Sequence, residues 1–250
     1  MNLRKNRSTR AAVAAAALSI FGVGGAALTA VAVTPGAAHA QLVSEKQELE
    51  MGRQAAEEVE RKYRLETGTS RARLVEQIGR KMASASKRSN LPWRFRVIQD
   101  KSVNAFSVPG YVYVHTGLLD SIGGDTDALA GVIAHEVAHT DAKHSKEQME
   151  KGALAGLLGS LISRGKGSTQ GWFNMGANLV LLNYSRSDEY EADRLAVNYM
   201  KRTGYDPNGM IRFFQKLQQM QGNQSRAVTF LQTHPSSGDR ITRIRQQINS

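Results

Sequence analysis

The amino-acid sequence predicts an α+β protein that is mainly helical and carries one small, mostly antiparallel sheet. Apolar residues recur at helical spacing in 44–86 and in most of 125–249, whereas residues 93–115 contain segments that alternate between apolar and polar side chains. Proline interrupts the helical pattern at Pro92. Residues 41–250 are enough to bury one sizeable hydrophobic core, so we expect a single folded domain there.

Two helices are expected at the start of this domain. Ser44 followed by Gln47 is the pattern of a capping box, and the apolar residues of 44–66 then recur at helical spacing. The second helix is expected over 70–86, where apolar residues again share one stripe, and it ends before Pro92.

The alternating region predicts short strands. In WRFRVIQD, the apolar residues Trp93, Phe95 and Val97 fall on one side. The next segment, NAFSVPGYVYVHTG, contains two strands joined at Pro109-Gly110. Together these strands predict the small sheet.

Four further helices are expected after the strands. Asp125 or Thr126 caps the first of them, Ser187 caps the second, and Gly204 ends the second. Pro207 follows an aspartate and begins the third helix. The four helices are expected over residues 125–143, 187–203, 206–220 and 238–249.

Two apolar stretches, 152–163 and 176–184, lie among these helices and are separated by the Gly- and Ser-containing loop 164–171. Each stretch is too short to cross a bilayer as a helix. Core packing explains most of their residues. The alternative is a lid over a cleft, or an edge that faces a membrane.

The first forty residues have the layout of a secretory signal peptide. Four basic residues and no acid precede an apolar run from Ala11 to Val33, and the small residues Ala38 and Ala40 form a cleavage site. We expect cleavage after Ala40, export, and a mature domain over 41–250. The alternative is an uncleaved membrane anchor, for which the run is long enough.

Charge and cysteine content narrow the function classes. The formal net charge of +11 falls to +7 when the first forty residues are removed, and twelve Lys and Arg face three acids between Arg61 and Lys101. Such a basic face favours phospholipid headgroups or nucleic acid, or is simply solvated. Tyr63, Trp93 and Phe95 are the only aromatic residues among these charges, and the sequence carries no nucleic-acid recognition motif, so no nucleic-acid partner is expected. The absence of cysteine excludes disulfides, thiolate metal sites and cysteine nucleophiles.

The segment AHEVAHTDAKHS carries the strongest chemical signal. On a helix, His135 and His139 lie four residues apart on one face and can bind one metal ion. Glu136 lies at the edge of that face, where it can take a proton from a water that the metal activates. This H-E-x-x-H spacing is typical of zinc peptidases, so we expect one Zn²⁺ per chain.

A catalytic zinc takes a third protein ligand. A continuous helix would turn His144 about 140° away from His139, so the better candidate is Glu189 in SRSDEYEAD. Asp193, four residues later, is placed to orient a ligand histidine, whereas Glu191 should point away. The alternative for this segment is an acidic helix start without a metal.

Four motifs in order resemble those of a known family, the HtpX-like and CAAX-prenyl-protease-type zinc peptidases of the gluzincin group. They are VNAFSVPGYVYVHTGLL, LAGVIAHEVAHTDAKHS, YSRSDEYEAD and THPSSGDRI, and they span nearly all of the mature chain. The resemblance implies a minimal gluzincin-like catalytic domain in which the sheet packs on a zinc-binding helix pair. One departure concerns the turn, since Gly110 is followed directly by Tyr111 where the family commonly has a second glycine.

The resemblance also implies that His234 lies near the zinc. There it would act in catalysis by stabilising the oxyanion, or it would cap the metal as a fourth ligand in a resting state. The residues alone favour a loop histidine held by Pro235. Asn104 either contacts the substrate backbone or closes a turn.

The closest likeness is to soluble periplasmic members that act in protein quality control. It implies a zinc endopeptidase for unfolded or misassembled envelope proteins, with partners at the membrane surface or in the envelope-assembly machinery. We expect an extended substrate to add to the sheet edge at Tyr111–His115. The alternative is a non-catalytic, metal-binding periplasmic chaperone of the same fold. The sequence makes no prediction of oligomeric state.

Overall fold

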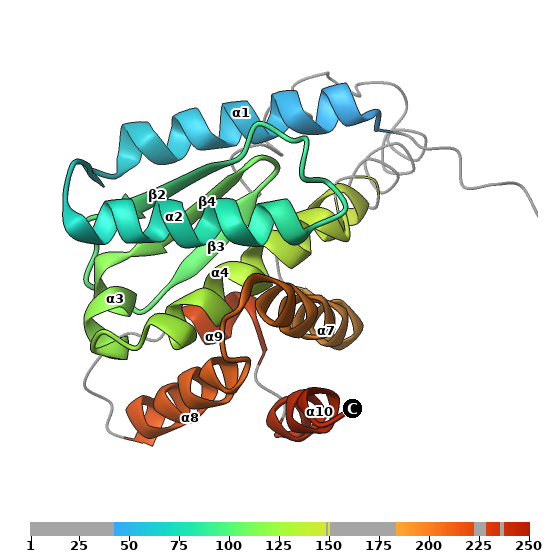
Figure 1. Ribbon diagram of the computed structural model, residues 1–250. Helices are drawn as coiled ribbons and strands as arrows, with labels where there is room; N and C mark the ends of the chain where they lie inside the picture. The colour runs from blue at the N-terminus through green and yellow to red at the C-terminus, as the bar shows by residue number, and fades with distance from the viewer. Residues whose placement is uncertain (1–42, 149, 151–183, 223–228, 236–237) are drawn as a thin grey trace, which may run out of the picture. The chain divides into compact units, whose positions relative to one another are not determined.

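The computed structural model describes residues 43–148, 150, 184–222, 229–235 and 238–250. The predicted signal peptide, the stretch 152–163, the loop 164–171 and residues 176–183 of the stretch 176–184 lie outside these residues. Within the described part of the chain the predicted class is confirmed, because helices dominate and surround one small sheet (Figure 1).

Most predicted elements are present, with boundaries that differ by a few residues. The helices are α1 (Glu45–Lys62), α2 (Ser70–Ala85), α3 (Thr116–Ile122), α4 (Thr126–Asp141), α7 (Arg186–Thr203), α8 (Asn208–Gly222), α9 (Phe230–Thr233) and α10 (Asp239–Ile248). The strands are β1 (Leu65–Glu66), β2 (Arg94–Ile98), β3 (Ala105–Val108) and β4 (Tyr111–His115). Ser44 and Gln47 form the predicted capping box of α1. Strand β1 and helices α3 and α9 were not predicted.

The sheet has the order β1-β2-β4-β3. β3 and β4 form an antiparallel hairpin at Pro109-Gly110, where Gly110 has a φ of 85° that favours glycine. β4 pairs with β2 in parallel, so the sheet is mixed even though two of its three pairings are antiparallel. β4 therefore lies inside the sheet, and the predicted substrate edge at Tyr111–His115 is wrong. The edge strands are β1 and β3.

Helices cover both faces of the sheet. α2 packs on one face so closely that a Cβ on Gly79 would lie 2.2 Å from the ring of Phe95. α1 covers the other face, where its apolar residues form a second cluster with Phe106 and Tyr113. Figure 1 shows both helices running alongside the strands.

α4 lies at the centre of the described fold. It contacts α2, α7, α8 and the edge strand β3, and every residue from Ala128 to Asp141 is buried. At Gly131 the neighbouring α8 comes so near that a Cβ would lie 2.6 Å from the Met210 side chain. A helix that is surrounded on all sides can hold polar side chains away from bulk water. None of the helices in the described residues is long and apolar enough to span a membrane.

Candidate metal centre

Two neighbouring helices carry the three predicted metal ligands. α4 places His135 and His139 one turn apart on a single face, as their spacing requires. α7 packs against α4 and carries Glu189 in its first turn. The helix pair therefore brings residues together that lie about fifty positions apart in the chain.

A capping box fixes where α7 begins. The N-cap is Ser185 and not the predicted Ser187. Ser185 Oγ accepts a hydrogen bond from Asp188 N at 3.2 Å, and Asp188 Oδ2 accepts one from Ser185 N at 3.0 Å. The reciprocal hydrogen bonds of a capping box require a side-chain acceptor three residues after the N-cap. Asp188 lies three residues after Ser185 but only one after Ser187, so Ser185 is the N-cap. The box sets the register that turns Glu189 toward α4.

Donor atoms of four residues converge in this region. His135 Nε2 lies 3.0 Å from His139 Nε2, 3.2 Å from His234 Nδ1 and 3.6 Å from Glu189 Oε2. Glu189 Oε1 lies 3.3 Å from His139 Nε2 and 3.0 Å from His234 Nδ1. Zinc bonds of about 2.0–2.1 Å to tetrahedral donors require donor–donor separations of about 3.3 Å. The residues present therefore fit one zinc ion.

All four side chains are buried, with at most 2% of their surface exposed. Burial, the largest influence on Glu189, opposes its ionisation. The surrounding histidines, His234 first among them, outweigh burial and hold the pKa of Glu189 far below its usual range. Burial prevails at His139 and lowers its pKa well below the ordinary value, so this imidazole is neutral. An ionised carboxylate and a neutral imidazole are the protonation states that a metal ion requires.

His234 reaches the cluster from the end of α9. Its ring stacks on Phe230, with centroids 4.4 Å apart and an angle of 18° between the planes. Burial opposes charge on His234, but the carboxylates of Glu136 and Glu189 outweigh burial and raise its pKa. The structure thus places His234 beside the predicted ligands, as the family resemblance implies. It does not place His234 in an exposed loop.

Glu136 lies within the same buried space. Its Oε2 accepts a hydrogen bond of 3.0 Å from the hydroxyl of Ser107 on the edge strand β3. Its Oε1 lies 3.4 Å from His234 Nε2 and has no hydrogen-bond partner among the described residues. The carboxylate is therefore anchored at one oxygen while the other faces the metal centre.

A buried guanidinium supports the two buried carboxylates of α7, those of Glu189 and Asp193. Arg240 of α10 donates to both oxygens of Asp193, at 2.7 and 2.8 Å, and also to Glu189. Asp193 Oδ1 in turn lies 3.0 Å from Nδ1 of His135, one of the two ligand histidines. Burial opposes charge on Asp193, yet Arg240 outweighs burial and lowers the pKa of this carboxyl group.

Arg240 is the functional residue that the sequence-based assignment missed. It lies in the closing motif THPSSGDRI, so the signal was present, but no spacing rule connects an arginine of the last helix to a carboxylate about fifty residues earlier. Its guanidinium also lies over the ring of Phe214, 4.4 Å from the ring centre. Only 1% of its surface is exposed.

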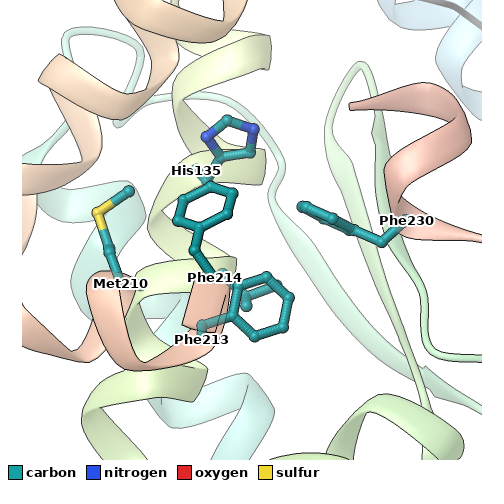
Figure 2. Close-up of a pocket in the computed structure, with 7 residues that line it drawn as sticks. His135, Met210, Phe213, Phe214 and Phe230 are labelled. Carbon is teal, nitrogen blue, oxygen red and sulfur yellow. The ribbon is translucent and has the colours of Figure 1, made fainter. Parts of the chain in front are cut away.

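The apolar side of the centre is closely packed. Figure 2 shows His135 and Phe230 with Met210, Phe213 and Phe214 of α8 around a pocket. The volume of this pocket is about 10 Å³. This volume is that of about one water, and the apolar walls offer no set of polar partners to hold one. The pocket is too small for a substrate side chain, so its walls serve to buttress His135.

The expectations for three other residues have different outcomes. His144 was expected to face away from the metal, yet its Nδ1 lies 3.0 Å from His139 Nδ1, because α4 ends at Asp141 and the chain turns back. Glu191 does point outward, with half of its side chain exposed. The structure does not bring Asn104 into the cluster, and its backbone carbonyl accepts a hydrogen bond from His115 N at 3.0 Å.

Sequence comparison finds relatives that are named as proteases. It is 32% identical over 185 residues, 69% of its length, to a protein of Vibrio cholerae provisionally named a beta-barrel assembly-enhancing protease. It is 32% identical over 177 residues, also 69% of its length, to the mitochondrial metalloendopeptidase OMA1 of Schizosaccharomyces pombe. The beta-barrel assembly-enhancing protease of Escherichia coli is 28% identical over 188 residues, 70% of the chain.

The chain matches only part of each relative. The alignment covers 38% of the Vibrio cholerae and Escherichia coli proteins and 51% of the Schizosaccharomyces pombe protein. The model of Peptidase family M48 matches residues 69–248, a span that contains both helices of the metal centre. The match confirms the predicted gluzincin resemblance, and the donor set agrees with the zinc that this family uses. The chain belongs to Peptidase family M48.

Proposed function

We propose that the chain is a zinc-dependent endopeptidase that hydrolyses peptide bonds in unfolded or misassembled envelope proteins. One observation carries the proposal. The donor atoms of His135, His139 and Glu189 converge at the separations of a zinc site, and Glu136 lies beside them in the same buried space. Cleavage of an unfolded protein by the wild type and by the Glu136→Gln variant is the experiment that tests it.

The chemistry divides between the ion and the chain. Zinc, when held by His135, His139 and Glu189, supplies a Lewis acid that polarises the scissile carbonyl and activates water. Glu136 takes the proton of the attacking water and delivers it to the leaving amine. Ser107 anchors Oε2 of that carboxylate, so Oε1 is the oxygen that receives the proton.

The sheet suggests how a substrate binds. β3 is an edge strand that packs against α4, and its Ser107 contacts Glu136. An extended peptide added to β3 would run beside the metal centre, and backbone hydrogen bonds would hold it with little regard to side chains. All four residues of β3 are buried, so the edge must first be uncovered. This mode of binding favours substrates that are already unfolded.

We further propose that the described arrangement is a resting state capped by His234. With His234 Nδ1 included, four protein donors complete a tetrahedron. A catalytic zinc site keeps one position open for water or substrate, whereas a structural site is closed. His234 must therefore leave before hydrolysis can begin.

Replacing His234 by Ala should raise the rate at which the zinc-loaded protein cleaves an unfolded substrate, because the fourth position is then open without a rearrangement. The measurement is kcat and KM on a fluorescently labelled casein, at zinc concentrations that saturate both proteins. A large fall in kcat with an unchanged KM would contradict the cap and assign His234 to oxyanion stabilisation instead.

The rival function is a non-catalytic metal-binding chaperone, in which four ligands form a permanent structural site. A structural zinc needs no carboxylate beside its ligands, yet Glu136 is fully buried there at the cost of desolvation. The position of Glu136 therefore favours hydrolysis. Absence of cleavage by both the wild type and His234→Ala would favour the chaperone.

We also propose export to the periplasm, with residues 1–40 removed and the domain 41–250 retained, and loose contact with the membrane surface. The outer face of α2 supports this contact, since Arg73, Arg80 and Lys81 are exposed there beside Leu74, which is 37% exposed. N-terminal sequencing of the protein from fractionated cells should begin at Gln41, and a high-salt wash should release membrane-bound protein. An intact N-terminus in the membrane pellet after the wash would instead indicate an uncleaved anchor.

A further inference from the structure

The turn after the metal-binding helix has an unusual backbone. α4 ends at Asp141, Ala142 forms its C-cap, and Lys143 adopts a φ of 64°. Lys143 is the one residue other than glycine with a positive φ in the described part of the chain. A lysine gains nothing locally from this conformation, which is sterically unfavourable for any residue with a Cβ. Such a conformation persists where surrounding contacts require it.

The contacts that hold Lys143 in this conformation are made by His144. His144 Nδ1 lies 3.0 Å from His139 Nδ1, and only 3% of the His144 surface is exposed. Helical residues resume at 144–148, so Lys143 breaks the helix for the turn that reverses His144 toward the metal centre. Without the break, His144 would lie about 140° further round the helix.

The proton between these two rings can be assigned. His139 Nε2 points at the other metal donors, so its lone pair must be free and its proton must be on Nδ1. That N–H then donates to His144 Nδ1, which leaves the His144 proton on Nε2. This nitrogen lies 3.6 Å from Glu191 Oε2 and has no closer acceptor in the described residues.

The two ligand histidines are thus supported differently. Behind His135 stands the carboxylate of Asp193, whereas behind His139 stands the imidazole of His144. A carboxylate makes a ligand imidazole more basic, while a neutral acceptor fixes its orientation and adds less negative charge. The same turn holds the face of the His139 ring, because Ser145 Oγ lies 3.1 Å from the hydroxyl of Tyr184, whose ring stacks on His139 at 3.9 Å.

We propose that His144 is a positioning residue of the metal centre, the hydrogen-bond acceptor that holds His139 in the tautomer and orientation for binding zinc through Nε2. This inference deepens the proposed function, since it concerns the same metal centre. It does not depend on catalysis, because zinc affinity can be measured without a substrate.

The test compares His144→Leu, which lacks an acceptor, with His144→Gln, whose side-chain oxygen can replace it. Zinc dissociation constants come from competition with a chelator of known affinity, and thermal melting of the metal-free proteins reports the fold. We expect His144→Leu to bind zinc about 10- to 100-fold more weakly and His144→Gln to bind it almost as tightly as the wild type. The control is Glu191→Gln. The Glu191 side chain is half exposed and lies on the far side of His144 from His139, so this variant should keep the wild-type affinity for zinc.

Two results would overturn the inference: wild-type affinity in His144→Leu, or an equal loss in His144→Gln. If His144→Leu does not fold, His144→Phe preserves the ring volume and carries the same expectation. If the zinc affinities differ as expected but neither the wild type nor any variant cleaves a substrate, the positioning role of His144 stands and the proposed protease is rejected. If the wild type cleaves a substrate but all the proteins bind zinc equally tightly, the proposed protease stands and the positioning role is rejected.

Discussion

Replacing Glu136 by Gln should reduce cleavage of an unfolded protein by about 10²- to 10⁴-fold, because an amide cannot accept the proton of the attacking water. The amide has nearly the same shape, and its oxygen can still accept the hydrogen bond that Ser107 donates to Oε2. Zinc content and the melting temperature should therefore stay at their wild-type values. The measurements are kcat on labelled casein, metal analysis of the purified protein, and thermal melting.

A matched control separates the role of Glu136 from the loss of one negative charge. Glu57→Gln makes the same chemical change on α1, where the side chain is 58% exposed, and should leave cleavage unchanged. Wild-type cleavage by Glu136→Gln with full zinc content would remove Glu136 from the mechanism. Loss of zinc in Glu136→Gln would mean that the substitution disturbs the metal centre and does not act on proton transfer.

Replacing Arg240 by Leu should destabilise the metal-free protein by about 3–5 kcal/mol, because two buried carboxylates lose their cation. Arg240 contacts both Glu189 and Asp193, and all three side chains are nearly inaccessible to solvent. For a chain of this size each kcal/mol lowers the melting temperature by about 2–4 °C. Thermal melting with and without zinc measures the effect, which should be smaller with zinc because the ion itself compensates Glu189.

An exposed arginine with similar partners provides the control. Arg212 contacts Asp125 and Asp206, but 42% of its side chain is exposed, so Arg212→Leu should cost about 1 kcal/mol or less. If Arg240→Leu does not fold, Arg240→Lys keeps the charge without the forked geometry and should lie between Leu and the wild type. Equal losses of stability in Arg240→Leu and Arg212→Leu would show that the burial of the Arg240 ion pairs adds nothing to the free energy of unfolding.

Arg240 and His144 support side chains of the metal centre from behind. Arg240 lowers the pKa of Asp193 and donates a hydrogen bond to Glu189, and His144 lies against the ring of one ligand. Side chains held in place lose little conformational entropy when zinc enters. This support therefore favours tight binding of one ion.

Much of this protein follows from local spacing alone. His135 and His139 share a helix face because residues four apart always do, and Glu136 follows from its place between them. The capping box at Ser44 and the left-handed end of α7 at Gly204 are equally local. The third ligand, Glu189, was within reach because a catalytic zinc takes a third protein ligand and because Asp193 follows Glu189 one helical turn later. Family M48 matches the span that contains both residues.

Other features depend on contacts between distant segments, for which a sequence carries no period. β4 lies inside the sheet because the β3–β4 hairpin docks through its second strand, a choice that the alternation of side chains does not reveal. The approach of Arg240 to Glu189 required the packing of α10 on α7. His144 reached His139 only because tertiary contacts hold Lys143 in a conformation that its own side chain disfavours. Sequence thus determined the ligands and their helices, whereas tertiary packing decided what surrounds and supports them, because burial energy depends on which surfaces meet.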